Sequence, residues 1–168
     1  MLAFSLLVLG IISRLIIHIP NFTPVIAIAL FGGVYLNKRQ ALWLPLGLLA
    51  ITDILIGFHE TMFYTWSSIF LISLLGVWLK KNKNSKTVFA SSLCASVFFF
   101  VVTNLGVWLS SGLYPLTLQG LRDCFIMAIP FFRYEMIATL VYTALFFGLY
   151  ELIAVRVKRT RFAYVLSN

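Results

Sequence analysis

The sequence predicts an all-α integral membrane protein with six transmembrane helices, and two observations carry this prediction. Strongly apolar segments alternate with short polar junctions along all 168 residues, and the basic residues gather at every second junction. The chain is also 61% hydrophobic and only 11% charged. Its mean hydropathy of +1.00 is far above that of a soluble domain. Residues 1–168 are therefore predicted to form a single transmembrane domain.

Five of the six apolar segments have about the length that a membrane-crossing helix needs, and the second is short. A helix crosses the hydrocarbon layer, roughly 30 Å thick, with about 20 apolar residues. The predicted spans are 2–19, 22–36, 41–58, 61–79, 87–109 and 131–155. The first span has no basic region before it and no small-residue cleavage site after it, so we expect an uncleaved helix rather than a signal peptide.

The distribution of basic residues predicts the orientation of these spans. Lys and Arg in short loops stay in the cytoplasm. Ten of the thirteen Lys and Arg residues lie at the junctions after the second, fourth and sixth spans: Lys38, Arg39, Lys80, Lys81, Lys83, Lys86, Arg156, Lys158, Arg159 and Arg161. Because the number of spans is even, the N-terminus and the C-terminus are both expected in the cytoplasm.

Small residues in the second span predict a close helix contact. Ala29 and Gly33 are four residues apart, and small residues at this spacing let helix backbones approach closely in lipid. Pro24 suits the first turn of this helix, where its missing N–H would have no partner. Two interpretations stay open: Ala29 and Gly33 pack within the protein, or they dock a partner membrane protein.

Pro130 predicts a break before the last span. The residue before a proline tends to leave the α-helical region. We therefore expect a separate short helix over residues 117–128 on the outer face, followed by the last span over 131–155. The loop over 110–120 is the longest non-apolar stretch outside, and long loops commonly carry lids and binding groups.

Polar side chains on four of the predicted helices lie at one depth in the outer half of the membrane. Ionisable residues inside spans are costly, usually face the protein interior and mark function. Most of these residues lie about five positions below the outer end of their helix, which is roughly 7–8 Å. They are Arg14, Asp53, Asn104, Arg133 and Glu135. The sequence thus predicts an outward-facing cavity lined by polar groups.

Residues just above this layer complete the predicted ligand site, with the segment 110–122 as its lid. These residues are His59, Trp108, Tyr114 and Arg122. A second interpretation is that Arg14 and Asp53 form an ion pair that holds two helices together, and that Arg133 and Glu135 pair in the same way. Such pairs do not exclude a site beside them. The three outward arginines indicate an anionic group on the solute, although two of them have carboxylates within reach.

Other classes of function find no support in the sequence. The basic residues are confined to loops without interleaved aromatic residues, so no nucleic-acid partner is expected. His59 and Glu60 alone do not make a metal site. No nucleophile triad, HExxH motif or phosphate-binding glycine motif is present. We therefore expect no catalytic residue, metal or cofactor, and Cys124 near the outer surface is the one candidate for a reactive thiol.

Four blocks of the sequence carry a resemblance to a known group of proteins. The blocks are SRLIIHIPNFTPVIAIALFGGVYL, DILIGFHETMFY, VVTNLGVWLSSGLYPLTLQGL and IPFFRYEMIATLVYTALFFGLYE. They resemble an uncharacterised bacterial family of small integral membrane proteins, which is described as similar to the substrate-binding S components of energy-coupling factor (ECF) vitamin transporters.

The resemblance implies a location in the bacterial cytoplasmic (inner) membrane and a vitamin-like solute that is captured near the outer surface. It also implies a coupling subunit with two ATPases as a partner. The small-residue motif that contacts this subunit usually lies in the first helix of S components. In this chain the corresponding residues, Ala29 and Gly33, lie in the second apolar segment.

The sequence therefore favours a substrate-binding membrane protein for the uptake of a small solute. One alternative is a structural or assembly protein whose polar layer only holds helices together. Another is a small membrane enzyme that acts through Cys124 or His59. A sizeable pocket beside the polar layer would favour the first hypothesis, and a close-packed outer half would favour the second.

Overall fold

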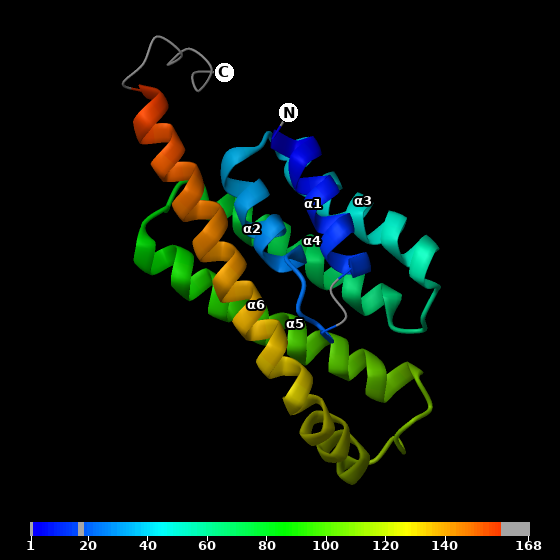
Figure 1. The fold of residues 1–168 in the computed structure, drawn as a ribbon. Coiled ribbons are helices and arrows are strands. Elements are labelled where there is room, and N and C mark those ends of the chain that lie inside the picture. Colours follow the sequence, from blue (N-terminus) through cyan, green and yellow to red (C-terminus); the bar gives the residue numbers. More distant parts are fainter. Residues whose placement is uncertain (1, 17–18, 159–168) are drawn as a thin grey trace.

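The computed structural model describes residues 2–16 and 19–158 as a bundle of six α-helices, and these residues contain no β-strand (Figure 1). The predicted all-α class is confirmed. The helices are α1 (Leu2–Ile16), α2 (Val25–Tyr35), α3 (Lys38–Ile56), α4 (Met62–Leu79), α5 (Ser85–Ser110) and α6 (Leu118–Lys158).

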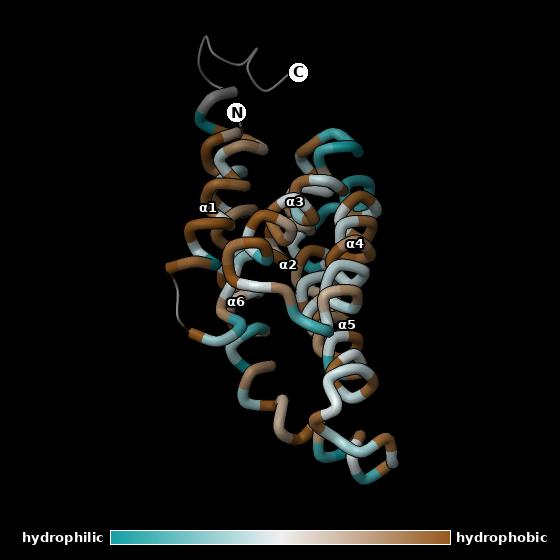
Figure 2. The backbone as a smooth tube through the Cα atoms, turned by 90° about the vertical axis from the view of Figure 1, so that its right-hand side faces the viewer, coloured by the Kyte–Doolittle hydropathy of each residue, from teal (hydrophilic) through white to brown (hydrophobic). Residues whose placement is uncertain are grey.

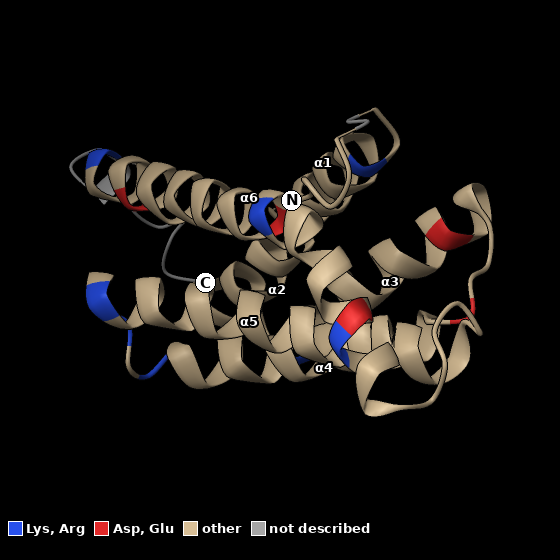
Figure 3. Ribbon diagram, turned by 90° about the horizontal axis from the view of Figure 1, so that it is seen from below, with Lys and Arg blue, Asp and Glu red and all other residues tan. Residues whose placement is uncertain are grey.

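Four helices, α3 to α6, are long and apolar enough to cross a membrane. Hydrophobic residues recur along the helices (Figure 2), and long helical stretches carry no Lys, Arg, Asp or Glu (Figure 3). The apolar helices α1 and α2 have only 15 and 11 residues. At 1.5 Å per residue, α2 is about 16 Å long, roughly half the hydrocarbon layer. The fold agrees with an integral membrane protein, while the six crossings stay a prediction.

The short helix α2 forms the centre of the bundle. It contacts each of the other five helices, and every residue from Val25 to Val34 is buried. Pro24 occupies the N-cap position of α2. A helix that is hydrophobic on all sides is stable only when other elements surround it. The sequence of α2 therefore determines its central place, which Figure 1 shows between α1 and α6.

Ala29 and Gly33 lie where α2 crosses α4. A Cβ atom at Gly33 would overlap the backbone of Gly76, and a Cβ at Gly76 would lie 2.8 Å from the carbonyl oxygens of Ala29 and Leu30. Ala29 has no exposed surface. These residues make the close contact within the protein that was one of the two interpretations. Because α4 covers them, neither Ala29 nor Gly33 presents a surface to a docking partner in this structure.

The continuity of α6 corrects the prediction of a break at Pro130. Residues 118–158 form one helix with Pro130 inside it, so no separate helix exists over 117–128. An internal proline removes a backbone hydrogen bond and bends a helix, and α6 changes direction near its yellow, lower end in Figure 1. The first part of α6 packs on α5, where Cys124 is buried with its Sγ atom 3.5 Å from the carbonyl oxygen of Asn104.

A polar cluster joins three elements at the end of the bundle where α1 begins and α6 ends (Figure 1). The hydroxyl group of Tyr35 donates a hydrogen bond to Glu151 at 2.5 Å. Lys83, in the loop between α4 and α5, forms an ion pair with Glu151 and donates to the Tyr35 oxygen at 3.1 Å. The cluster lies among the junctions that are rich in Lys and Arg. Arg159 and Arg161 lie outside the described residues.

Lys83 has a raised pKa in this cluster. Its partial burial disfavours the charged form, but the hydrogen bonds to Glu151 and Tyr35 favour it and prevail. Because the side chains of both Lys83 and Glu151 are exposed to solvent, their ion pair contributes little to stability.

Candidate functional site

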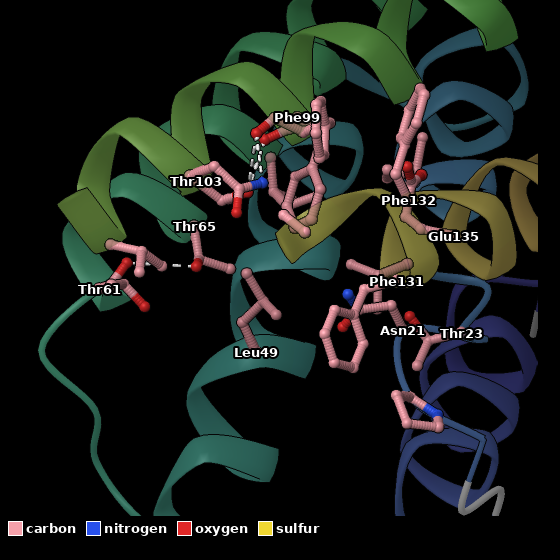
Figure 4. Close-up of a pocket in the computed structure, with 18 of the residues that line it drawn as sticks. Asn21, Thr23, Leu49, Thr61, Thr65, Phe99, Thr103, Phe131, Phe132 and Glu135 are labelled. Atoms are coloured by element: carbon pink, nitrogen blue, oxygen red, sulfur yellow. Dashed lines mark hydrogen bonds between the residues drawn. The ribbon is translucent and has the colours of Figure 1, made fainter. Parts of the chain in front are cut away.

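A partly open cavity of about 570 Å³ lies at the opposite end of the bundle, near the connections α1–α2 and α3–α4 (Figure 4). Residues from all six helices or their flanking turns line it. Cavities that bind small molecules commonly measure about 300–1,000 Å³. The structure therefore contains a ligand-sized cavity in the half of the protein where the sequence predicts one.

Polar side chains from several elements converge on this cavity. Thr61, Thr65 and Thr103 lie on one side of it in Figure 4, Glu135 lies on α6 across from them, and Asn21 and Thr23 come from the α1–α2 connection. The remaining polar lining residues are Arg14, His59 and Asn104. Of the nine residues predicted to bind a ligand, the structure brings four to the cavity: Arg14, His59, Asn104 and Glu135.

Arg14 and Asp53 form an ion pair beside the cavity, as the sequence allowed. Nη2 of Arg14 lies 2.8 Å from Oδ1 of Asp53, and Nη1 donates to the Thr52 hydroxyl oxygen at 2.5 Å. The indole nitrogen of Trp66 donates to Oδ2 of Asp53 at 2.9 Å. Asp53 is only 1% exposed and does not line the cavity.

Glu135 is the second carboxylate of the site, and its partners are hydroxyl groups. Ser96 on α5 donates to Oε2 at 2.7 Å, and Thr139, one turn along α6, donates to Oε1 at 2.9 Å. The residue is 6% exposed, and that surface faces the cavity. The predicted partner Arg133 is exposed on another face of α6, with its guanidinium 5.7 Å from the ring centre of Tyr134.

Three neutral polar residues on α4 and α5 present oxygen atoms at the cavity. The hydroxyl groups of Thr65 and Thr103 donate their protons to the backbone carbonyls one turn earlier, at 3.2 and 2.8 Å. The amide nitrogen of Asn104 donates to the carbonyl of Phe100 at 2.7 Å. A hydroxyl group has one proton but two lone pairs, and an amide oxygen is only an acceptor. The two hydroxyl groups can therefore only accept hydrogen bonds from whatever occupies the cavity, whereas Asn104 can accept through its oxygen and keeps a second N–H proton.

The remaining predicted site residues do not line this cavity. The indole nitrogen of Trp108 donates to the carbonyl oxygen of Pro115 at 3.0 Å, which holds the loop close to the end of α5. Arg122 lines a shallow depression on the surface of α5 and α6. Tyr114, in the loop between these helices, is half-buried. Because α6 starts at Leu118 and runs on without a break, the segment 110–122 lies beyond the cavity and does not cover it.

The hydroxyl residues that complete the site are not among those predicted from the sequence. Thr52, Ser96 and Thr139 hold the charged groups, and Thr65 and Thr103 line the cavity. Single Ser and Thr residues are common in membrane helices, so they raise no signal alone. Their spacing is a signal, however. Glu135 and Thr139 are four residues apart, which places them on the same face of a helix, and Thr61 and Thr65 have the same spacing.

Comparisons with known proteins give the family of the chain. The sequence model of a family described as a family of unknown function, DUF6580, matches residues 1–161, and the chain belongs to this family. No curated protein and no solved structure matches the chain.

Proposed function

We propose that this member of DUF6580 is a substrate-binding membrane protein that captures a small solute in the cavity between α1, α4, α5 and α6 for uptake. The observation that carries the proposal is the cavity itself. It has the size of a small-molecule site, and four helices contribute polar groups to it. A protein that only needed polar residues to hold its helices together would pack this region closely, because a cavity removes contacts that stabilise the fold.

The proposed orientation places this cavity on the outer side of a bacterial inner membrane. Lys38, Arg39 and the four lysines of residues 80–86 lie at the other end of the bundle. Basic residues in short loops favour the cytoplasmic side. In this orientation the chain crosses the membrane six times, with α2 as a short central helix in the core, and solutes reach the cavity from outside.

The resemblance to S components supports a vitamin-like solute and a coupling subunit with ATPases as the energising partner. Such a partner has to use a surface other than Ala29 and Gly33, because α4 covers them. Exposed apolar surfaces on the long helices are available for this contact.

The ion pair between Arg14 and Asp53 supports the alternative of a purely structural protein. That pair joins α1 to α3 and needs no ligand, since Thr52 and Trp66 complete its hydrogen bonds. It does not account for Glu135, Asn104 and the threonines, which face a cavity large enough for a solute.

Filling the cavity tests the proposal. Thr65→Phe adds a ring at the cavity wall and should block any solute, whatever its charge. The wild-type protein and the variant are purified in detergent, and the small molecules that each retains are compared by mass spectrometry. We expect at least one molecule that the wild-type protein retains and the variant loses.

Cys94→Phe is the matched control, because it adds the same ring at an exposed position of α5 outside the cavity. This variant should retain the molecule. Asn104→Ala, which removes an acceptor without filling space, should retain it more weakly. If wild-type protein and Thr65→Phe carry the same small molecules, the cavity is no solute site and the structural alternative is favoured.

A further inference from the structure

The balance of charge around the cavity indicates what kind of solute it accepts. Among the described residues, Arg14 and Glu135 are the two charged side chains that line it, beside His59. The charge of Arg14 is balanced by Asp53 at 2.8 Å. No described residue forms an ion pair with Glu135. The cavity therefore holds one carboxylate that has no ion-pair partner in the part of the chain that the structure describes.

A buried carboxylate is costly unless an opposite charge or several donors surround it. Glu135 is 6% exposed, and the hydroxyl groups of Ser96 and Thr139 are its hydrogen-bond donors in the structure. Each oxygen of a carboxylate can accept two hydrogen bonds. A positively charged group that enters the cavity would supply both the missing charge and further donors.

The other groups at the cavity agree with a positive solute. Thr65 and Thr103 present acceptor oxygens, because their hydroxyl protons are already donated to the backbone. Asn104 adds an amide oxygen, which can only accept, while one of its two N–H protons is donated to the backbone. An aromatic ring stands beside the carboxylate: Figure 4 shows Phe132 next to Glu135. The faces of aromatic rings attract cations.

The sequence pointed to an anionic solute because three arginines were expected on the outer side. In the structure, Arg122 and Arg133 lie away from the cavity, and Arg14 is engaged by Asp53 and Thr52. Glu135 is therefore the charged lining residue that has no ion-pair partner among the described residues.

We propose that the solute carries a positive charge, as an amine or an organic ammonium ion, and that Glu135 and the ring of Phe132 hold this charged end. This inference rests on the proposed function and deepens it by naming the chemical class of the solute. Acceptors on α4 and α5 would then bind the N–H or O–H groups of the same molecule.

Binding of matched pairs of probes to the full chain in lipid nanodiscs tests the inference. Each pair joins a cation with a neutral molecule of nearly the same shape: choline with 3,3-dimethylbutan-1-ol, and benzylammonium with benzyl alcohol. The shift in thermal unfolding is recorded as a function of probe concentration. In the wild-type protein, at least one cation should bind more tightly than its neutral partner.

Glu135→Gln keeps the shape of the side chain and removes its charge. It should weaken the binding of that cation by at least about tenfold, or about 1.4 kcal/mol. Phe132→Leu should weaken the binding of the cation by about two- to fivefold and leave the binding of its neutral partner unchanged. This second variant keeps the carboxylate and so reports on the site even if Glu135→Gln folds poorly. Glu60→Gln is the control, because Glu60 is exposed in the α3–α4 connection outside the cavity.

The inference is overturned if no cation is preferred over its neutral partner, or if the preference persists in both site variants. It is also overturned if the molecule lost on Thr65→Phe substitution is neutral or anionic. That last result would still support solute binding in the cavity. The loss of no molecule at all in Thr65→Phe would instead contradict the proposed function itself.

Discussion

Asp53 on α3 holds Arg14 of α1 through an ion pair of 2.8 Å, and the carboxylate is almost completely buried. The same carboxylate accepts a hydrogen bond from Trp66 on α4. One acidic side chain thus connects three helices at the wall of the cavity. The position of Arg14 there depends on this connection, because its guanidinium has no other acidic partner among the described residues.

Removal of Arg14 should destabilise the protein strongly. Arg14→Met leaves Asp53 buried without a positive partner, which typically costs about 3–5 kcal/mol. The double variant Arg14→Met/Asp53→Leu removes both charges and should recover much of this loss. Unfolding of the detergent-solubilised protein measures the effect. Arg133→Met, at an exposed position of α6, is the control and should change stability little. A single variant as stable as the wild-type protein would contradict a structural role of the pair.

Gly33→Ala should destabilise the contact between α2 and α4. The added methyl group would overlap the backbone of Gly76, which no side-chain movement relieves. Overpacking of this kind costs about 1–3 kcal/mol, and the thermal unfolding temperature should fall accordingly. Gly148→Ala on α6 adds the same methyl group where no atom lies within 4 Å. It should leave that temperature unchanged or raise it, and equal effects of the two variants would argue against the close crossing.

Cysteine labelling tests the proposed orientation. In a background with Cys94→Ala and Cys124→Ala, a membrane-impermeant maleimide is applied to intact cells. Leu113→Cys, in the exposed α5–α6 loop, should be labelled directly. Asn82→Cys, in the lysine-rich loop after α4, should be labelled only after the cells are opened. The reverse pattern would place the cavity on the cytoplasmic side and exclude uptake from outside.

The contact between Lys83 and Glu151 should stabilise the protein in a pH-dependent way. The pKa of Lys83 is raised in the folded protein above its ordinary value of 10.5, so the folded state holds the proton more tightly than the unfolded chain does. This stabilisation is complete below the ordinary value and is lost as the pH rises through the raised pKa.

Glu151→Gln should therefore lower stability by no more than about 1 kcal/mol at neutral pH. The difference from the wild-type protein should shrink as the pH rises above the ordinary lysine pKa. Asn82→Ala in the same loop changes no charge, so its difference from the wild-type protein should stay constant. A difference between wild-type and Glu151→Gln protein that grows with pH would contradict the sign of the Lys83 shift.

The predicted polar layer agrees with the structure in the depth of several side chains along their helices and differs from it in the direction in which others point. Position along the helix was enough to bring Arg14, Asn104 and Glu135 to one cavity, because antiparallel helices align equal depths. The side of the helix on which a residue lies depends on how the helices rotate against each other. Arg133 and Glu135 are only two residues apart, yet one is exposed and the other lines the cavity.

Hydrophobicity and charge along the chain are enough to predict the helical class, the apolar segments and the polar ends of the bundle, because both act residue by residue on the transfer into lipid. The spacing of Ala29 and Gly33 also predicts a close helix contact. The folded structure is needed to show that α4 is their partner, that α6 continues through Pro130, and that hydroxyl groups rather than an arginine hold Glu135. These features depend on contacts between segments far apart in the chain, and no local pattern specifies which of several apolar faces will meet.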